Sequence, residues 1–170
     1  MLRAGRLRRA RGAGSVALLL TFLLCQEMGA EEIPQLRREL AGEDDPAERA
    51  RITVKLGDEL LREAGRMYRA GAYTDGDLFL ADYLKAVRAA FDALQQSGRD
   101  ARRKPKGFKD LEIHLRKSQR TLEDLLRLVP YENRTAVEET KQETEEIRQL
   151  LLGQLMKVNL RREQQEEEQP

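Results

Sequence analysis

The chain has 170 residues, of which 36% are charged and only 5% aromatic. Such a composition favours long amphipathic helices, whereas a β-sheet protein needs more β-branched and aromatic residues. The formal net charge is +1, and the single cysteine, Cys25, excludes a framework of intrachain disulfides.

The first thirty residues have the pattern of a secretory signal peptide. Val16 to Cys25 is apolar apart from Thr21, and it follows a basic, acid-free start. At about ten residues, this stretch is roughly half the ~20 needed for a transmembrane span. We therefore predict export to the periplasm or the cell exterior, with cleavage after Ala30. The alternative is a membrane tether formed by an uncleaved N-terminal segment.

Removal of residues 1–30 changes the charge balance. The segment carries five arginines and one glutamate, so 26 basic and 29 acidic residues remain, a net charge of about −3. The remainder also lacks cysteine, so its stability must come from a packed core. The basic excess that would favour nucleic-acid binding belongs to the signal peptide, and no nucleic-acid partner is expected.

Residues 31–45 are predicted to form a short arm or linker, with a helix from Ile33 to Ala41 that Gly42 breaks. Asp45 and Pro46 then form a helix-start signal. Apolar residues at three-to-four spacing predict helices over about 46–70 and 75–96, and Thr74 with Asp77 resembles a capping pair for the second of these.

A further helix over about 108–129 has the clearest pattern, because its apolar positions alternate at spacings of three and four, as in a coiled coil. Another helix is predicted over about 133–162. Thr140 and Thr144 interrupt its apolar stripe, so its first half is expected to fray or to pack at an edge. Residues 163–170 are predicted to form a disordered acidic tail.

The short connections predict antiparallel helical pairs. The expected fold class is therefore all-α, either an antiparallel four-helix bundle or two stacked helical hairpins.

Residues 60–86 resemble a tetratricopeptide repeat hairpin. The matching positions are Leu60 and Ala64 on the first helix, Gly71 and Tyr73 at the turn, and Leu80 and Tyr83 on the second helix. Gly76 replaces the usual alanine, and no proline closes the second helix. Because the second hairpin does not repeat the motif and a solenoid needs at least three repeats, the resemblance covers one hairpin only. It implies an adaptor that binds other proteins.

Catalytic and metal-binding patterns are missing from the sequence after residue 30. The single histidine, His114, lies beside the seam of the 108–129 helix, where a partly exposed surface position is expected. No second histidine, phosphate-binding loop or nucleophile elbow accompanies it. We therefore expect no catalytic residues, no metal and no cofactor, and a protein that is not an enzyme.

One segment, residues 99–120, is strongly basic, with nine basic and three acidic residues. Neutralisation by acids of the same chain is the simplest interpretation, and an anionic membrane or envelope polymer is the functional alternative. The residues predicted to bind an anionic partner are Arg99, Arg102, Arg103, Lys104, Lys106 and Lys109.

The main functional expectation is an exported, non-catalytic adaptor or scaffold with an unidentified protein partner. Its candidate contact residues are Tyr73, Leu78 and Phe79, for which packing against a neighbouring helix is the competing interpretation. The alternatives are a self-associating structural protein, with the 108–129 seam or the 133–162 helix pairing between chains, and binding to an anionic surface through residues 99–120.

Overall fold

The computed structural model describes residues 32–156, which form five α-helices, one short 3₁₀ helix and no strand. The helices are α2 (Glu32–Ala41), α3 (Pro46–Arg69), α4 (Tyr73–Gln96), α5 (Phe108–Leu128), η1 (Tyr131–Asn133) and α6 (Thr135–Met156). The predicted all-α class is confirmed, and each predicted helix end within this range falls within two residues of the observed one.

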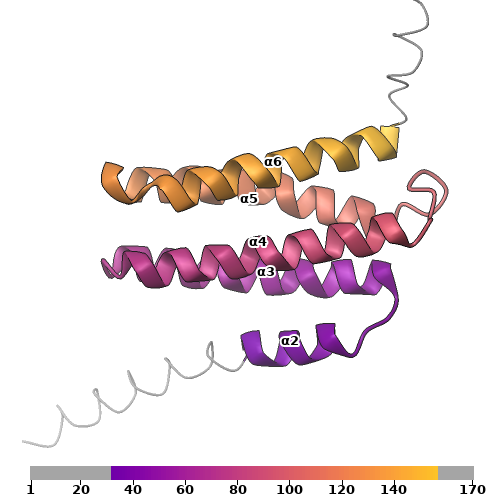
Figure 1. The fold of residues 1–170 in the computed structure, drawn as a ribbon, viewed down its shortest axis with the longest axis horizontal. Helices are drawn as coiled ribbons and strands as arrows, with labels where there is room; N and C mark the ends of the chain where they lie inside the picture. The colour runs from indigo at the N-terminus through magenta and orange to yellow at the C-terminus, as the bar shows by residue number, and fades with distance from the viewer. Residues whose placement is uncertain (1–31, 157–170) are drawn as a thin grey trace, which may run out of the picture.

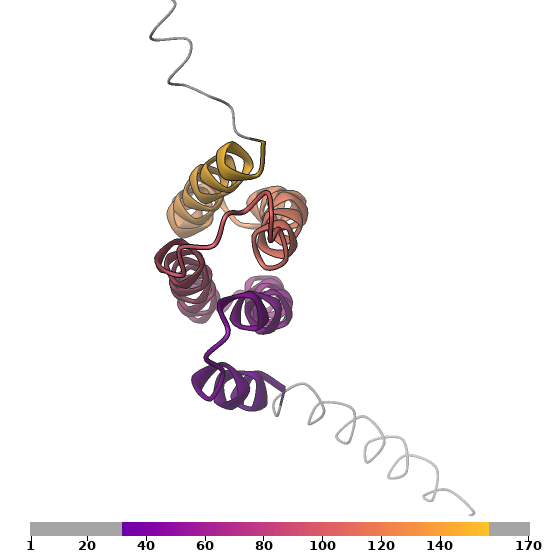
Figure 2. The same ribbon diagram turned by 90° about the vertical axis from the view of Figure 1, so that its right-hand side faces the viewer.

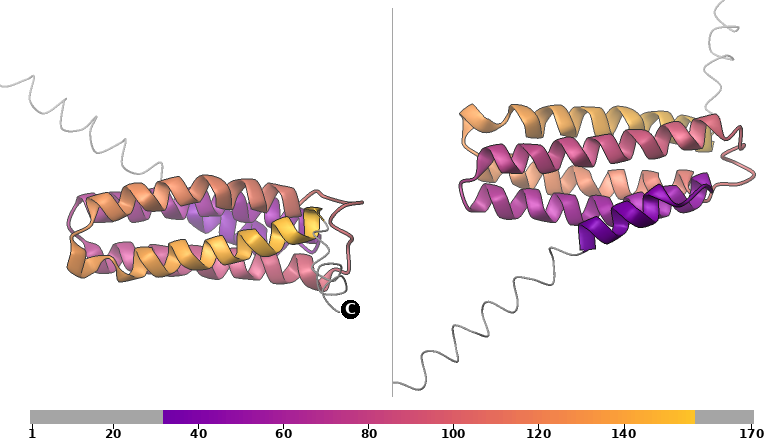
Figure 3. Two further views of the ribbon diagram at one scale, coloured as in Figure 1. Left: turned by 90° about the horizontal axis from the view of Figure 1, so that it is seen from above. Right: turned by 60° about the horizontal axis from the view of Figure 1, so that its bottom comes forward.

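The helices form a stack of three layers. α3 and α4 make one antiparallel hairpin, α5 and α6 make a second, and α2 lies beside α3 on the side away from the second hairpin (Figures 1 and 2). α3 packs on α5 and α4 packs on α6, so each helix lies on a parallel helix of the other layer (Figure 3). Within residues 32–156, the helices therefore form a bundle in which two antiparallel hairpins stack.

The predicted seam of α5 forms the centre of the core. Leu111, Leu115 and Leu122 are fully buried. Every seam residue is 3% exposed or less, and the seam consists of Phe108, Leu111, Leu115, Ser118, Leu122, Leu125 and Val129. Each buried leucine side chain stabilises the fold by about 1.5–3 kcal/mol. Because the seam is covered by the chain's own helices, it offers no surface for pairing with a second chain.

The first half of α6 is firmly packed, so the prediction that it frays or lies at an edge was wrong. Thr140 is 5% exposed and Thr144 is fully buried. Their hydroxyls donate to the carbonyls of Ala136 and Thr140 at 2.7 and 2.8 Å, and Gln119 Nε2 on α5 donates to Thr144 Oγ1 at 2.9 Å. These bonds satisfy the hydroxyl groups, which lets threonine occupy a buried stripe.

The predicted capping pair at the start of α4 was also wrong. The helix begins at Tyr73, and its N-cap residue, Ala72, makes no side-chain capping bond. Asp77 accepts a hydrogen bond of 2.7 Å from the Tyr68 hydroxyl on α3. Burial raises the pKa of Tyr68, and the bond to Asp77 raises it further. The carboxylate therefore joins the two helices of the hairpin.

The predicted arm is a helix docked on the stack. Ile33 and Leu36 of α2 are buried, and Arg37 pairs with Asp82 of α4 at 2.5 Å. Arg49 Nη1 on α3 donates to the carbonyls of Leu40 and Glu43 at 3.0 and 2.7 Å, which fixes the connection.

The predicted signal peptide with its cleavage after Ala30, Cys25 and the predicted tail 163–170 lie outside the described residues. Within residues 32–156, no helix is both long and apolar enough to span a bilayer.

Candidate functional site

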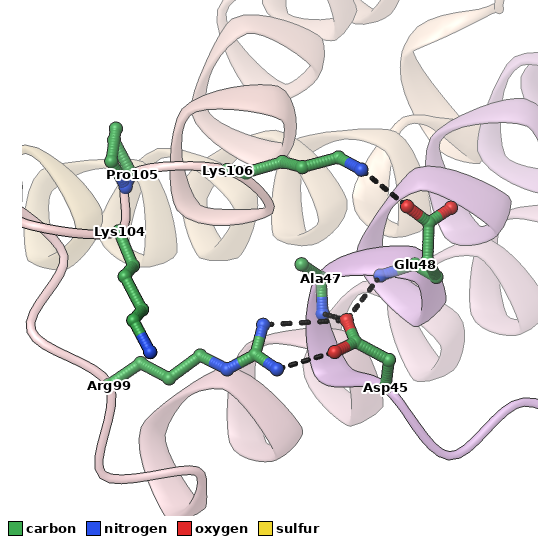
Figure 4. A pocket seen from close by; sticks show the side chains of 7 residues that line it. All are labelled: Asp45, Ala47, Glu48, Arg99, Lys104, Pro105 and Lys106. Carbon is green, nitrogen blue, oxygen red and sulfur yellow. Dashed lines mark hydrogen bonds and ion pairs between the residues drawn. The ribbon is translucent and has the colours of Figure 1, made fainter.

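The start of α3 is held by the loop that joins α4 to α5. Asp45 caps the helix, and its Oδ1 accepts from the backbone N–H groups of Ala47 at 2.8 Å and Glu48 at 3.1 Å. The guanidinium of Arg99 also binds this carboxylate (Figure 4). The bond from Arg99 is the main cause that lowers the pKa of Asp45 to about 2, and the N–H of Glu48 adds to it.

A second ion pair joins the same loop to α3. Lys106 Nζ lies 2.5 Å from Glu48 Oε1, which lowers the pKa of Glu48 and raises the pKa of Lys106. The loop can approach this closely because Gly107 has a φ of +85°, and a Cβ there would lie 2.8 Å from Ala47 Cα. Arg99 and Lys106, two of the six residues predicted to bind an anionic partner, are therefore engaged within the chain.

The space between the loop and α3 is an open hollow of about 630 Å³, lined among others by Asp45, Arg99 and Lys104 (Figure 4). Lys104 extends along this hollow and makes no ion pair within residues 32–156. Within residues 32–156, the acidic partner of Arg103 is Asp100, at 3.7 Å. An acidic ligand at the α3 N-terminus would compete with the Asp45 carboxylate, so the hollow itself is a poor anion site.

Further exposed cations continue from the loop along the outer side of α5. We define the cationic edge as the exposed basic residues between 102 and 120 that have no acidic partner within 4.0 Å in the described part of the chain: Arg102, Lys104, Lys109, Lys117 and Arg120. The acids of this stretch are engaged elsewhere. Asp110 accepts from the Gly107 N–H at 3.4 Å, and the buried Glu112 lies 3.4 Å from Arg148 of α6. The cationic edge therefore consists of three lysines and two arginines that the ion pairs within residues 32–156 leave available.

The three predicted protein-contact residues differ in exposure. Leu78 is 64% exposed on the outer side of α4. Tyr73 and Phe79 are half-buried against the core, and the ring of Tyr73 lies 6.5 Å from that of Tyr68. The structure therefore gathers no apolar patch from these three residues, because two of them take part in internal packing.

His114 is 3% exposed, so the expectation of a partly exposed surface position was wrong. Its Nδ1 lies 3.2 Å from Oδ1 of Asp58 on α3, and this contact lowers the pKa of Asp58. The imidazole fits between α3 and α5 because the facing residue is Gly57. A Cβ at Gly57 would lie 2.7 Å from His114 Nε2 and 3.0 Å from Tyr83 Cε2.

Three buried polar atoms meet no hydrogen-bond partner within residues 32–156: His114 Nε2, Tyr83 OH and Thr53 Oγ1. The Tyr83 and His114 rings pack edge to face, with centroids 5.8 Å apart, and burial raises the pKa of Tyr83. An Asp–His pair beside a hydroxyl resembles the arrangement of catalytic groups in some enzymes. Here, however, the hollows by the loop and between α4 and α6 are lined by other residues. His114 and Tyr83 are buried in the core, and neither lines one of these hollows.

No group of three or more histidine, cysteine, aspartate or glutamate side chains within residues 32–156 could hold a metal ion. No protein-family model, curated protein or solved structure matches the chain. The resemblance of residues 60–86 to a tetratricopeptide repeat hairpin stays a prediction.

Proposed function

We propose that this chain is an exported, non-catalytic adaptor that binds an acidic segment of another protein along the cationic edge. The observation that supports the proposal is that Arg102, Lys104, Lys109, Lys117 and Arg120 are all exposed and have no acidic partner within residues 32–156. Unpaired charges of one sign attract a complementary partner and accelerate its association.

A protein partner is favoured over a membrane because of how α5 is packed. A helix that lies on a bilayer buries its apolar face among the lipids. The apolar face of α5 is already buried in the stack, where Leu111, Leu115 and Leu122 are fully covered.

A protein partner is also favoured over nucleic acid. Phe108, the one aromatic residue of segment 99–120, is 1% exposed and offers no ring on which a base could stack.

The test is a cross-linked pull-down of the tagged chain from its native host. The double variant Lys109→Glu/Arg120→Glu reverses two charges of the edge, and Lys85→Glu serves as the control because Lys85 is exposed on α4. We expect the wild type and the control to capture the same protein and the double variant to lose it, with unchanged melting temperature.

Equal capture by all three chains would remove the cationic edge as the contact surface. If the double variant instead loses only binding to phosphatidylglycerol vesicles and no protein is captured, the partner is an anionic membrane and the adaptor proposal fails.

A second candidate function is self-association through α6. Leu150 and Met156 are 56% and 68% exposed, and they lie three residues to either side of Gly153. A Cβ at Gly153 would meet nothing within 4 Å, so a second helix could approach closely there. Sedimentation at two concentrations tests this candidate. A concentration-dependent dimer that Leu150→Glu abolishes would support it, and a monomer at both concentrations would exclude it.

A further inference from the structure

The loop end of the stack has more positive than negative charge. Residues 99–109 contain six basic residues and one acid, Asp100. Asp45 and Glu48 neutralise Arg99 and Lys106, and Asp100 lies near Arg103. Arg102, Lys104 and Lys109 remain exposed with no acidic partner in the described part of the chain. Three positive charges at this end are therefore not neutralised by residues 32–156.

The end of α6 lies next to this loop. Gln154 lines the same hollow, of about 240 Å³, as Arg99, Asp100 and Ala101. In Figure 1 the end of α6 and the loop between α4 and α5 occupy the same end of the stack. The chain continues past Met156 for fourteen residues, and these include the run Glu166-Glu167-Glu168.

From this geometry we infer that Glu166, Glu167 and Glu168 bind Arg102, Lys104 and Lys109 of the same chain and compete with the acidic partner. This inference rests on the proposed function. Nine residues separate Met156 from Glu166. Fully extended, they reach roughly 30 Å, which allows the run to reach the loop beside Gln154.

Tethering makes even a weak contact effective. A short tether sets a local concentration on the order of millimolar, so an intrinsic affinity in that range is enough for the acidic run to occupy the loop. Charge-assisted pairs between carboxylates and Lys or Arg supply such an affinity when several act together, and salt weakens them. A partner must therefore bind the loop more strongly than the tethered acidic run does.

The experiment compares two full-length variants that remove the same number of negative charges. One changes Glu166, Glu167 and Glu168 to Gln, and the matched control changes Glu138, Glu139 and Glu146, which are exposed on α6 without an ion pair within residues 32–156. The probe is a fluorescein-labelled octaglutamate peptide, whose binding is followed by fluorescence anisotropy at low and high salt.

We expect the variant at residues 166–168 to bind the probe on the order of tenfold more tightly than the wild type at low salt, because the competing segment has been neutralised. The control should gain no more than about twofold, and the difference should vanish at high salt. An equal gain in both variants would show that only net charge matters and would overturn the inference.

A second measurement adds residues 163–170 as a separate peptide. It should bind the variant neutralised at 166–168, and the further change Lys104→Glu/Lys109→Glu should abolish this binding. Binding that survives the further change would place the contact elsewhere and overturn the inference.

The two proposals fail separately. Equal probe binding by the two glutamine variants, with loss of the probe in Lys109→Glu/Arg120→Glu, removes the self-contact and keeps the adaptor surface. If the 163–170 peptide binds at the loop but no protein is captured in the host, the self-contact is kept and the adaptor proposal fails.

Discussion

Polar groups are used in two different ways in the middle of the stack and at its loop end. Beside Gly57, the buried His114 Nε2 and Tyr83 OH meet no hydrogen-bond partner within residues 32–156, and both rings occupy space that a side chain at Gly57 would need. Around Asp45, the charges are half-buried or exposed, and they are joined in pairs between α3 and the loop. Steric fit dominates at the first site, and screened electrostatics at the second. Changes to the middle should therefore affect stability, and changes to the loop end should affect binding.

The largest effect is expected from removing core volume. Leu115→Ala deletes a fully buried side chain of the α5 seam and should lower the free energy of unfolding by about 2–5 kcal/mol. Urea unfolding followed by circular dichroism measures this loss. A loss below about 1 kcal/mol would mean that the seam is not at the centre of the core.

Adding volume beside His114 should have the next largest effect. Gly57→Ala places a Cβ 2.7 Å from His114 Nε2, and such overpacking costs about 1–3 kcal/mol. The same substitution in a His114→Ala background should cost clearly less, because most of the clash has gone. Equal losses in the two backgrounds would show that the close fit to the imidazole is not the reason for glycine at this position.

Gly153 provides the matching test where space is open. A Cβ there meets nothing within 4 Å, so Gly153→Ala should raise the free energy of unfolding by about 0.5–1 kcal/mol through its better helix propensity. The measurement is the same urea titration, at a concentration where the chain is monomeric. A decrease would indicate that this side of α6 is covered in solution.

The loop end should show a change in titration with little change in stability. The Asp45 carboxyl, followed by NMR, should titrate near pH 2, and Arg99→Ala should move its midpoint up toward the ordinary value of 3.8. A lowered pKa stabilises the fold above about pH 4, and that contribution disappears as the pH falls toward 2. A midpoint that stays near 2 in the variant would assign the shift to the helix N–H groups instead of Arg99.

The sequence predicted the helices and the α5 seam because apolar spacing records which face of a helix is buried. The predictions from the sequence were wrong where a polar residue is buried because a residue on another helix makes room for it or binds it. His114 depends on Gly57 of α3, and Thr144 depends on Gln119 of α5 and on a backbone carbonyl of its own helix. Local spacing carries no information about such contacts.

The candidate surface was predictable only in part for the same reason. The basic segment was evident, but the pairing of Arg99 and Lys106 with α3 depends on which helix end faces the loop. Tyr73 and Phe79 likewise pack against the core because of the hairpin geometry.

The contact between Gly57 and His114 had one signal in the sequence. A glycine in the middle of a strongly predicted helix often has a packing reason.

The most direct test is an amide and side-chain NMR titration of the full chain with the octaglutamate peptide. We expect shifts at Arg102, Lys104, Lys109, Lys117 and Arg120 that disappear at high salt, while the side-chain signals of His114 and Tyr83 stay unchanged. Shifts centred on His114, or an unchanged cationic edge at saturating peptide, would contradict binding along the cationic edge.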